Sequence, residues 1–326
     1  MKNYDKIFSM KNKSLIKIHF LNTIWSDAIL LESNNHYGMI DTGSAFYYPM
    51  VNEYLNKLNI TKLDFIILTH FHSDHYGNIS NIINDYNVNT LYMKRYYGLD
   101  GSTAKGYASN LEYIQNEFKN YNNIVSLAIN KTNIIYIDEL NTDELEIPFF
   151  GYNIELFNIR NTLFNIYNNP ESIYYHEKKF NENYNSIGIF IKINRFNIFL
   201  AGDVTCSDNE CEDVNKLAIK MVNRIYEKHN INHIDVYKSA HHGGSGANPL
   251  ELCKLLKAKY VIITNTDRWL DNYSTKDNLR LSNKNVKIFQ TDHQKIIFNI
   301  TNKNFTSKIE IQEEIEESLF ITLNKD

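Results

Sequence analysis

The chain has 326 residues, of which 43% are hydrophobic, and its formal net charge is -4. This length and apolar content allow a sizeable core in one large domain or two small ones, and so mild a charge gives no reason to expect a nucleic-acid partner. Only 4 prolines and 12 glycines occur, which excludes a linker-rich or disordered chain. The 3 cysteines lack a disulfide-framework spacing, no stretch reaches the ~20 apolar residues that cross a bilayer, and no signal peptide is recognisable, so we expect a cytoplasmic protein with no membrane partner.

Apolar patterning in the first half of the chain predicts strands that end in polar loops. Strands are expected over residues 15–21, 28–31, 37–40 and 65–68, with a helix over 50–58. A further strand, 88–93, leads into residues 94–131, where the pattern loosens apart from a helix over 111–118. We interpret 94–131 as an insertion and as a candidate lid.

The second half predicts a second group of strands. Strands over 134–137 and 152–158 are followed by a long irregular loop over 160–184 and a hairpin over 187–200. Later strands are expected over 234–238, 260–264, 286–289, 295–300 and 308–311, and helices over 212–228 and 250–256. Strands clustered in each half, with helices between them, predict an α/β fold: an αββα sandwich in a single domain over residues 1–326, with a C-terminal extension around 301–326.

The densest group of potential metal ligands lies between the strand 65–68 and an amphipathic run that begins near residue 79. It consists of His70, His72, Asp74 and His75. The alternate residues His70 and His72 would face one metal ion, whereas Asp74 and His75 would turn towards a second. Imidazole and carboxylate are ligands for zinc and similar divalent ions. A polar loop with chance histidines is the alternative, but the ligand density and the strand–loop–helix setting disfavour it.

This His-x-His-x-Asp-His run after an apolar strand resembles the metallo-β-lactamase superfamily. The resemblance implies the four-layer αββα sandwich of that superfamily, a hydrolase, and two divalent ions, with zinc expected and manganese as the alternative. It also implies that Asp41 orients the metal loop by hydrogen bonds without binding metal. Asp27 is a candidate second supporting carboxylate, although a turn residue is equally expected there.

Two later strand ends provide the remaining predicted ligands. Asp203 follows an apolar hairpin strand and a glycine, where a carboxylate can bridge two metals; the alternative is a helix N-cap. His241 and His242 follow the strand 234–238 and precede two glycines, which let the backbone come close to a metal. We favour His241 as a ligand of the second ion and assign His242 to support or proton donation, so Asp74 and His242 are the predicted catalytic residues.

No suitable third histidine for the first metal stands between His75 and Asp203. Superfamily hydrolases of lactams, lactones and thioesters usually place one there, beside glycine. The only candidate, His176, lies in the irregular loop, and we interpret it as a loop histidine. The slot holds Asn-Tyr-Asn-Ser at 183–186, which together with Gly-Asp and His-His-Gly resembles the DNA-uptake competence proteins. A closer resemblance, carried by residues 17–20, 26–33, 62–65 and 91–94, is to the catalytic domain of the phosphorylcholine esterases. Asn185, Ser186 and Lys238 are therefore expected to support the site.

The expected chemistry is cleavage of a phosphodiester or phosphorylcholine-type ester by a hydroxide that bridges two metal ions. Four neutral imidazoles and two carboxylates would leave two divalent cations with net positive charge, which suits an anionic ester, small or polymer-linked. The rival functions are a nuclease of the DNA-uptake type and a non-catalytic metal-binding module. Candidate phosphate contacts and stacking aromatics, with surface cations and ordinary packing as the alternatives, are Lys94, Arg95, Arg160, Lys238, Arg268, Tyr96, Tyr97 and Trp269.

Overall fold

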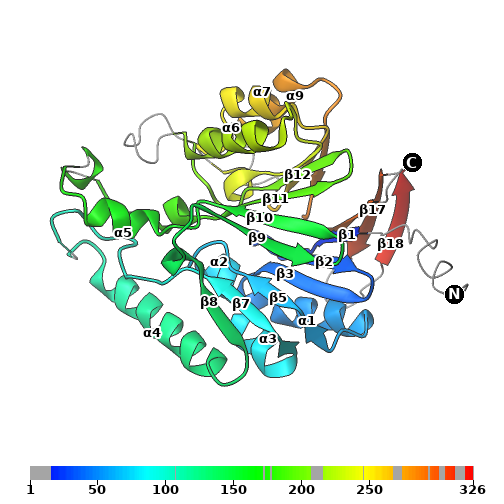
Figure 1. Ribbon diagram of the computed structural model, residues 1–326. Helices are drawn as coiled ribbons and strands as arrows, with labels where there is room; N and C mark the ends of the chain where they lie inside the picture. The colour runs from blue at the N-terminus through cyan, green and yellow to red at the C-terminus, as the bar shows by residue number, and fades with distance from the viewer. Residues whose placement is uncertain are drawn as a thin grey trace, which may run out of the picture.

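The computed structural model describes residues 16–106, 108–171, 173–176, 178–206, 216–244, 246–266, 274–292, 294–300, 305–312 and 320–325. Two large sheets face each other, and helices cover the outer side of each (Figure 1). The predicted αββα sandwich is confirmed. No helix among the described residues combines the length and the apolar character needed to span a bilayer.

The first sheet has the strand order β18-β17-β16-β1-β2-β3-β5-β7-β8. The strands β3, β5, β7 and β8 run parallel, so the loops that follow them leave from one edge of the sheet. A short parallel pair, β4 with β6, lies beside it. The bounds are β1 (Ile16–Phe20), β2 (Ala28–Ser33), β3 (His36–Thr42), β4 (Lys62–Leu63), β5 (Phe65–Ile67), β6 (Asn87–Val88), β7 (Thr90–Met93), β8 (Asn133–Tyr136), β16 (Gln294–Ile300), β17 (Phe305–Gln312) and β18 (Phe320–Lys325).

The second sheet has the order β15-β14-β13-β12-β11-β10-β9. Its strands β12 to β15 are parallel, so their following loops also share an edge. The bounds are β9 (Glu144–Phe149), β10 (Tyr152–Phe157), β11 (Gly188–Ile193), β12 (Phe196–Leu200), β13 (Val236–Lys238), β14 (Tyr260–Ile263) and β15 (Lys287–Gln290).

The helices complete the outer layers. Figure 1 shows α1, α3 and α4 below the first sheet and α6, α7 and α9 above the second. The bounds are η1 (Ala45–Tyr47), α1 (Tyr48–Lys57), α2 (Ser73–Tyr76), α3 (Ile79–Asp85), α4 (Leu111–Ala128), η2 (Ile137–Glu139), α5 (Thr162–Tyr167), η3 (Ile173–His176), η4 (Glu182–Asn185), α6 (Leu217–His229), η5 (Ala240–Gly243), α7 (Leu250–Leu256) and α9 (Thr275–Ser282).

Three buried clusters lie between the four layers, one between the sheets and one under each helical layer. On β2, Ile29 and Leu31 face the core between the sheets, while Ala28 and Leu30 face the helices. Successive side chains of a strand point to opposite faces, so a strand that is covered on both faces is apolar throughout. Each fully buried aliphatic side chain contributes about 1.5–3 kcal/mol.

Several element predictions need correction. The helix expected over 111–118 continues to Ala128 as α4, because Tyr121, Ile124 and Ala128 extend its buried face. The loop expected over 160–184 contains the helix α5. The strand β9 was not predicted, because Pro148 lacks a backbone N–H and argues against a strand, although Leu145, Ile147 and Phe149 alternate. Residues 320–325 form a strand, β18, that pairs with β17. The predicted start of the helix over 212–228 lies outside the described residues.

Candidate metal centre

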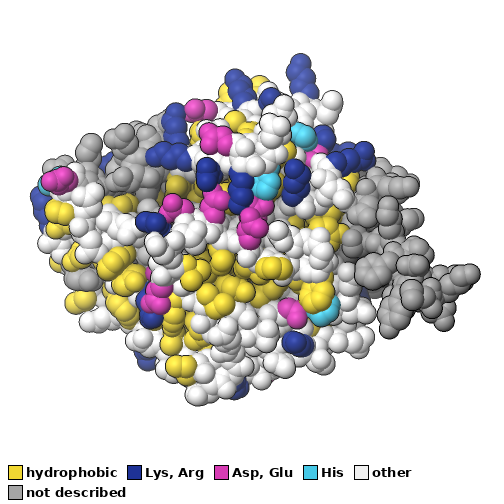
Figure 2. Space-filling view, viewed as in Figure 1, with side chains coloured by type: hydrophobic (Ala, Val, Ile, Leu, Met, Phe, Trp, Pro, Cys, Tyr) yellow, Lys and Arg dark blue, Asp and Glu magenta, His cyan; other side chains and the backbone are white. Residues whose placement is uncertain are grey.

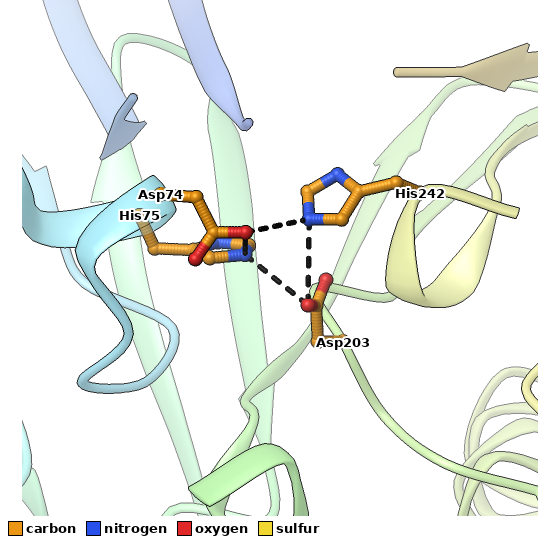
Figure 3. Close-up of side chains that lie close together, drawn as sticks. All are labelled: Asp74, His75, Asp203 and His242. Carbon is orange, nitrogen blue, oxygen red and sulfur yellow. Dashed lines mark ion pairs between the residues drawn. The ribbon is translucent and has the colours of Figure 1, made fainter. Parts of the chain in front are cut away.

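The candidate metal centre lies where loops from the two sheets meet. Asp74 and His75 are on α2, directly after β5, whereas Asp203 follows β12 and His242 follows β13. One ligand atom from each of these side chains lies within 4.8 Å of those from the others. Figure 3 shows the four side chains pointing towards one another from both sides of the sandwich. The prediction that segments far apart in sequence would converge here agrees with this arrangement.

The donor atoms of this group are close enough to share one cation. His75 Nε2 lies 3.3 Å from Asp203 Oδ2 and 3.8 Å from Asp74 Oδ2. His242 Nε2 lies 3.2 Å from Asp74 Oδ2 and 3.4 Å from Asp203 Oδ2. Both Nε2 atoms are buried and make no hydrogen bond. Because an unpaired buried nitrogen is costly, this donor set fits a divalent metal ion well.

Each histidine of the group has its other ring nitrogen held by a carboxylate. His75 Nδ1 lies 2.7 Å from Asp41 Oδ2, and Asp41 also accepts hydrogen bonds of 2.8 Å from the backbone N–H and the hydroxyl of Thr69. His242 Nδ1 lies 2.9 Å from the Thr264 hydroxyl, which donates to Asp27 Oδ1 at 2.7 Å, and it lies 3.3 Å from the same Asp27 oxygen. Such carboxylates fix the tautomer so that Nε2 keeps its lone pair for a metal. Asp41 and Asp27 thus lie behind the two histidines, on the side of the Nδ1 atoms.

Backbone conformation explains how two adjacent histidines separate. His241 and His242 both have positive φ angles, 49° and 51°, and Gly243 follows with a φ of 81°. Left-handed residues other than glycine cost about 1–3 kcal/mol each, so they persist only where the surrounding structure holds them. The turn is held by Thr275, whose hydroxyl donates to the Gly243 carbonyl at 2.7 Å.

The two histidines take places opposite to those we favoured from sequence. His242 lies in the four-residue group, whereas His241 lies outside it, with Nε2 at 3.4 Å from Asn183 Nδ2. The sequence could not show which of the two histidines faces Asp203, because that depends on the left-handed backbone conformation of both residues. Both His241 Nδ1 and Asn183 Oδ1 are buried without a hydrogen-bond partner.

His70 and His72 lie together beside this group. His70 Nε2 is 3.0 Å from His72 Nδ1 and 3.9 Å from Asp203 Oδ2. Behind them, Ser186 Oγ lies 3.0 Å from His70 Nδ1 and accepts the N–H of Asp203 at 2.9 Å. Asp203 is therefore close both to His70, on one side, and to His75 and His242, on the other, which is the position that a bridging carboxylate needs.

The carboxylates and imidazoles shift one another's pKa. Burial opposes ionisation of Asp203, but the imidazoles of His242 and His75 outweigh it and hold its pKa well below its usual range. Asp203 in turn raises the pKa of both histidines well above the usual value, against the effect of burial. The pKa of Asp74 is lowered to about 2, since His75 and His242 again outweigh burial. These carboxylates require positive charge nearby, which protons or a divalent cation can supply.

The basic side chains proposed as phosphate contacts are engaged elsewhere. Lys238 is fully buried, forms an ion pair with Asp27, and donates to the Gly202 carbonyl at 3.1 Å. Lys94 is also buried and donates to the carbonyls of Arg160 and Asn185; burial lowers its pKa to about 7. Arg95 pairs with Glu139 and Arg160 with Asp143, both at exposed positions.

The remaining predicted residues have structural roles or lie outside the described ranges. Asn185 turns away from the histidines: its Oδ1 accepts the N–H of Leu163 at 3.1 Å. His176 is exposed and lies at the end of the short helix η3, not in an irregular loop. Tyr96 packs in the core near Phe71, and Tyr97 stacks on Phe164. Arg268 and Trp269 lie outside the described residues.

Comparisons with known proteins support the fold. Residues 26–149 match the family model of the metallo-beta-lactamase superfamily. The matched residues make up less than half of the chain. Members of this superfamily are usually hydrolases and typically bind two metal ions. No curated protein matches the chain.

Solved structures with this fold are similar at low identity. The metallo-β-lactamase fold protein YhfI from Bacillus subtilis is 13% identical, with 84% of this chain and 95% of that chain covered and a TM-score of 0.45. A diphosphatase from the PhnP family is 12% identical, with coverage of 88% and 99% and a TM-score of 0.43. An archaeal superfamily protein from Sulfolobus tokodaii is 14% identical, with coverage of 66% and 76% and a TM-score of 0.34. At these values nothing about substrate follows from the likeness.

Proposed function

We propose that this metallo-β-lactamase superfamily domain is a binuclear metallohydrolase that cleaves phosphoric esters, either phosphodiesters or esters of the phosphorylcholine type. The observation that supports this most is that buried ligand atoms without hydrogen-bond partners converge where loops from the two sheets meet. His70, His72 and Asp203 would hold one divalent cation. Asp74, His75, His242 and Asp203 would hold the other. When bound, such ions lower the pKa of water towards neutrality and neutralise phosphoryl oxygens.

The ligand chemistry favours an anionic substrate. The imidazoles would bind as neutral ligands, so only Asp74 and Asp203 bring negative charge, and two divalent cations would leave the site positive. Lys238 does not change this balance because Asp27 pairs with it. A positive, preorganised site stabilises the charge that develops when a phosphoric ester is cleaved.

The place of a third histidine strengthens the assignment to phosphoric esters. Ser186 contacts His70 from behind, and Asn183 lies beside His241, so neither position provides an imidazole to the first site. We propose that His241 and Asn183 face the substrate. The unpaired Nδ1 of His241 would hold a proton near the leaving group, and the unpaired Oδ1 of Asn183 would accept a hydrogen bond from the substrate. This exchanges the roles that the sequence suggested for the two histidines.

No observation favours the nuclease. Acidic and basic side chains are interspersed over the described part of the face in Figure 2. Among the ion pairs of the second sheet and its helices, Lys228 pairs with Glu144, Glu146 and Glu155. A nucleic-acid groove would instead gather positive charge.

The test is a substrate panel with zinc or manganese added: bis-p-nitrophenyl phosphate, p-nitrophenylphosphorylcholine, single-stranded DNA, a β-lactam and a lactone. We expect turnover of the first two by the wild type and none by Asp203→Asn. The matched control is Asp64→Asn, which removes the same charge. Asp64 contacts His36, at the end of β3 that lies away from Asp41 and the metal centre. Turnover confined to the lactam and lactone would refute the assignment. Degradation of DNA alone would favour the nuclease, and stoichiometric metal binding without any turnover would favour a non-catalytic module.

A further inference from the structure

The insertion expected as a lid carries a carboxylate that reaches the first pair of histidines. Asp100 lies between β7 and α4 and is 6% exposed. Its Oδ2 lies 3.0 Å from His72 Nε2 and accepts a 3.0 Å hydrogen bond from the hydroxyl of Tyr113, on α4. Its Oδ1 accepts the N–H of Glu182 at 2.9 Å. Asp100 is therefore held from two sides before it meets the histidine.

This contact decides which nitrogen of His72 is available. An ionised carboxylate only accepts hydrogen bonds, so His72 Nε2 must carry a hydrogen where it meets Asp100. The remaining lone pair is then on Nδ1, the atom that lies 3.0 Å from His70 Nε2. The two nitrogens that face each other are thus the two that would bind a shared cation.

We propose that Asp100 is a positioning residue that sets His72 as an Nδ1 ligand, so that the insertion maintains the first metal site. This rests on the proposed binuclear centre. The two sites then differ in their support: His75 contacts Asp41, which lies on β3, and His242 contacts Asp27, just before β2, whereas His72 contacts Asp100 of the insertion. Loss of Asp100 should therefore weaken one site and spare the other.

The same helix also holds α2, the segment that carries Asp74 and His75. The Tyr76 hydroxyl donates to Glu117 Oε2 at 2.8 Å and accepts from Asn120 Nδ2 at 2.9 Å. Tyr76 and Glu117 are both 6% exposed. Hydrogen bonds from Tyr113 to Asp100 and from Tyr76 to Glu117 thus join α4 to the metal loop, so this part of the insertion contacts the site in the structure.

The experiment compares Asp100→Asn with Glu112→Gln. Glu112 is a carboxylate from the same insertion, exposed in the first turn of α4. Zinc affinity is measured by competition with a chromophoric chelator. We expect two ions per wild-type chain, a loss of about 10–100-fold in affinity for one of them in Asp100→Asn, and wild-type affinities in Glu112→Gln. Equal affinities in wild type and Asp100→Asn would overturn the proposal.

A second measurement uses wild-type protein, so it still tests the proposal if the Asp100→Asn variant fails to fold. Wild-type protein labelled with ¹⁵N-histidine and loaded with ¹¹³Cd should show cadmium coupling to His72 Nδ1 and a slowly exchanging hydrogen on Nε2, with the signals assigned from their loss in His72→Asn. Coupling to Nε2 would overturn the proposal. Wild-type protein that binds no metal, or that binds it without cleaving phosphoric esters, would instead count against the proposed function.

Discussion

Replacement of Asp41 by asparagine tests how the second site selects its ligand nitrogen. Asp41 Oδ1 accepts the N–H of Thr69, while Oδ2 accepts both the Thr69 hydroxyl and His75 Nδ1. In Asp41→Asn the amide oxygen would stay with the Thr69 N–H, which places the amide NH₂ group against His75. Because an amide nitrogen cannot accept a hydrogen bond, the His75 hydrogen would move to Nε2, the atom that faces Asp203.

The magnitude follows from what is lost. A hydrogen bond to a charged group contributes about 1.5–3 kcal/mol, and about 1.4 kcal/mol corresponds to a tenfold change in a binding constant. The affinity for one of the two zinc ions should therefore fall about 10–100-fold, in line with other changes to residues that orient a metal ligand. The bulk of the fold should be unaffected, since Asn has the shape of Asp.

The assay is a competition titration with a chromophoric chelator, with Asp64→Asn as the control. Asp64 also contacts a histidine nitrogen, His36 Nδ1 at 2.9 Å, and accepts a backbone N–H, that of Tyr37. The Asp64→Asn variant removes the same charge, but residue 64 contacts no predicted metal ligand, so the zinc affinities of this variant should equal those of the wild type. If Asp41→Asn bound both ions as tightly as wild type does, the argument that this carboxylate sets the tautomer of His75 would be refuted.

Three further predictions concern the same region. Replacing His242 by alanine should reduce bound zinc from two ions to one, whereas His241→Ala should keep both ions and lose turnover; elemental analysis beside a rate measurement separates them. Asp203 raises the pKa of His75 and His242, so zinc binding should release protons and should weaken as pH falls from about 8 to about 6. Calorimetry in buffers of different ionisation enthalpy measures the released protons, and binding that does not depend on pH would contradict this prediction. Burial, and then Asp100, raises the pKa of Glu182 to about 8, so the folded protein binds this proton more tightly than the unfolded chain, whose carboxyl has a pKa of about 4.3. Stability should therefore fall as pH rises from about 4.3 to about 8, and in chelator-treated protein Glu182→Gln should be more stable than wild type at the upper end by up to a few kcal/mol, measured by urea unfolding; equal pH profiles would contradict this.

The sequence was sufficient where chemistry and local pattern coincide. His70, His72, Asp74 and His75 follow a buried strand within six residues, so their convergence needs only one loop. Asp203 was placed because an apolar hairpin strand leads into it. Parallel strands that end at one edge then bring separate loops together, which is a property of the fold and not of any one residue.

The sequence was insufficient where position depends on side-chain direction or on distant packing. His241 and His242 are chemically equivalent neighbours, and only their left-handed backbone decides which one faces Asp203. Asp100 lies in a segment without periodicity, and nothing nearby in sequence shows that it reaches His72. Lys94 and Lys238 suggested phosphate binding by charge, but burial gives both of them internal partners.

Asp27 shows why the centre depends on how the two sheets pack together. Its backbone N–H donates to the Asp74 carbonyl at 3.2 Å, on the side of the first sheet. Its carboxylate accepts the hydroxyl of Thr264 at 2.7 Å, and it pairs with Lys238 and His242, all three on the side of the second sheet. Burying the Lys238–Asp27 pair is costly, and such a pair contributes little net stability against apolar residues of the same size. Its value here is geometric: one residue, through its backbone N–H and its carboxylate, fixes Asp74 and His242 relative to each other, so the ligand atoms from opposite sheets meet at distances that a single cation can span.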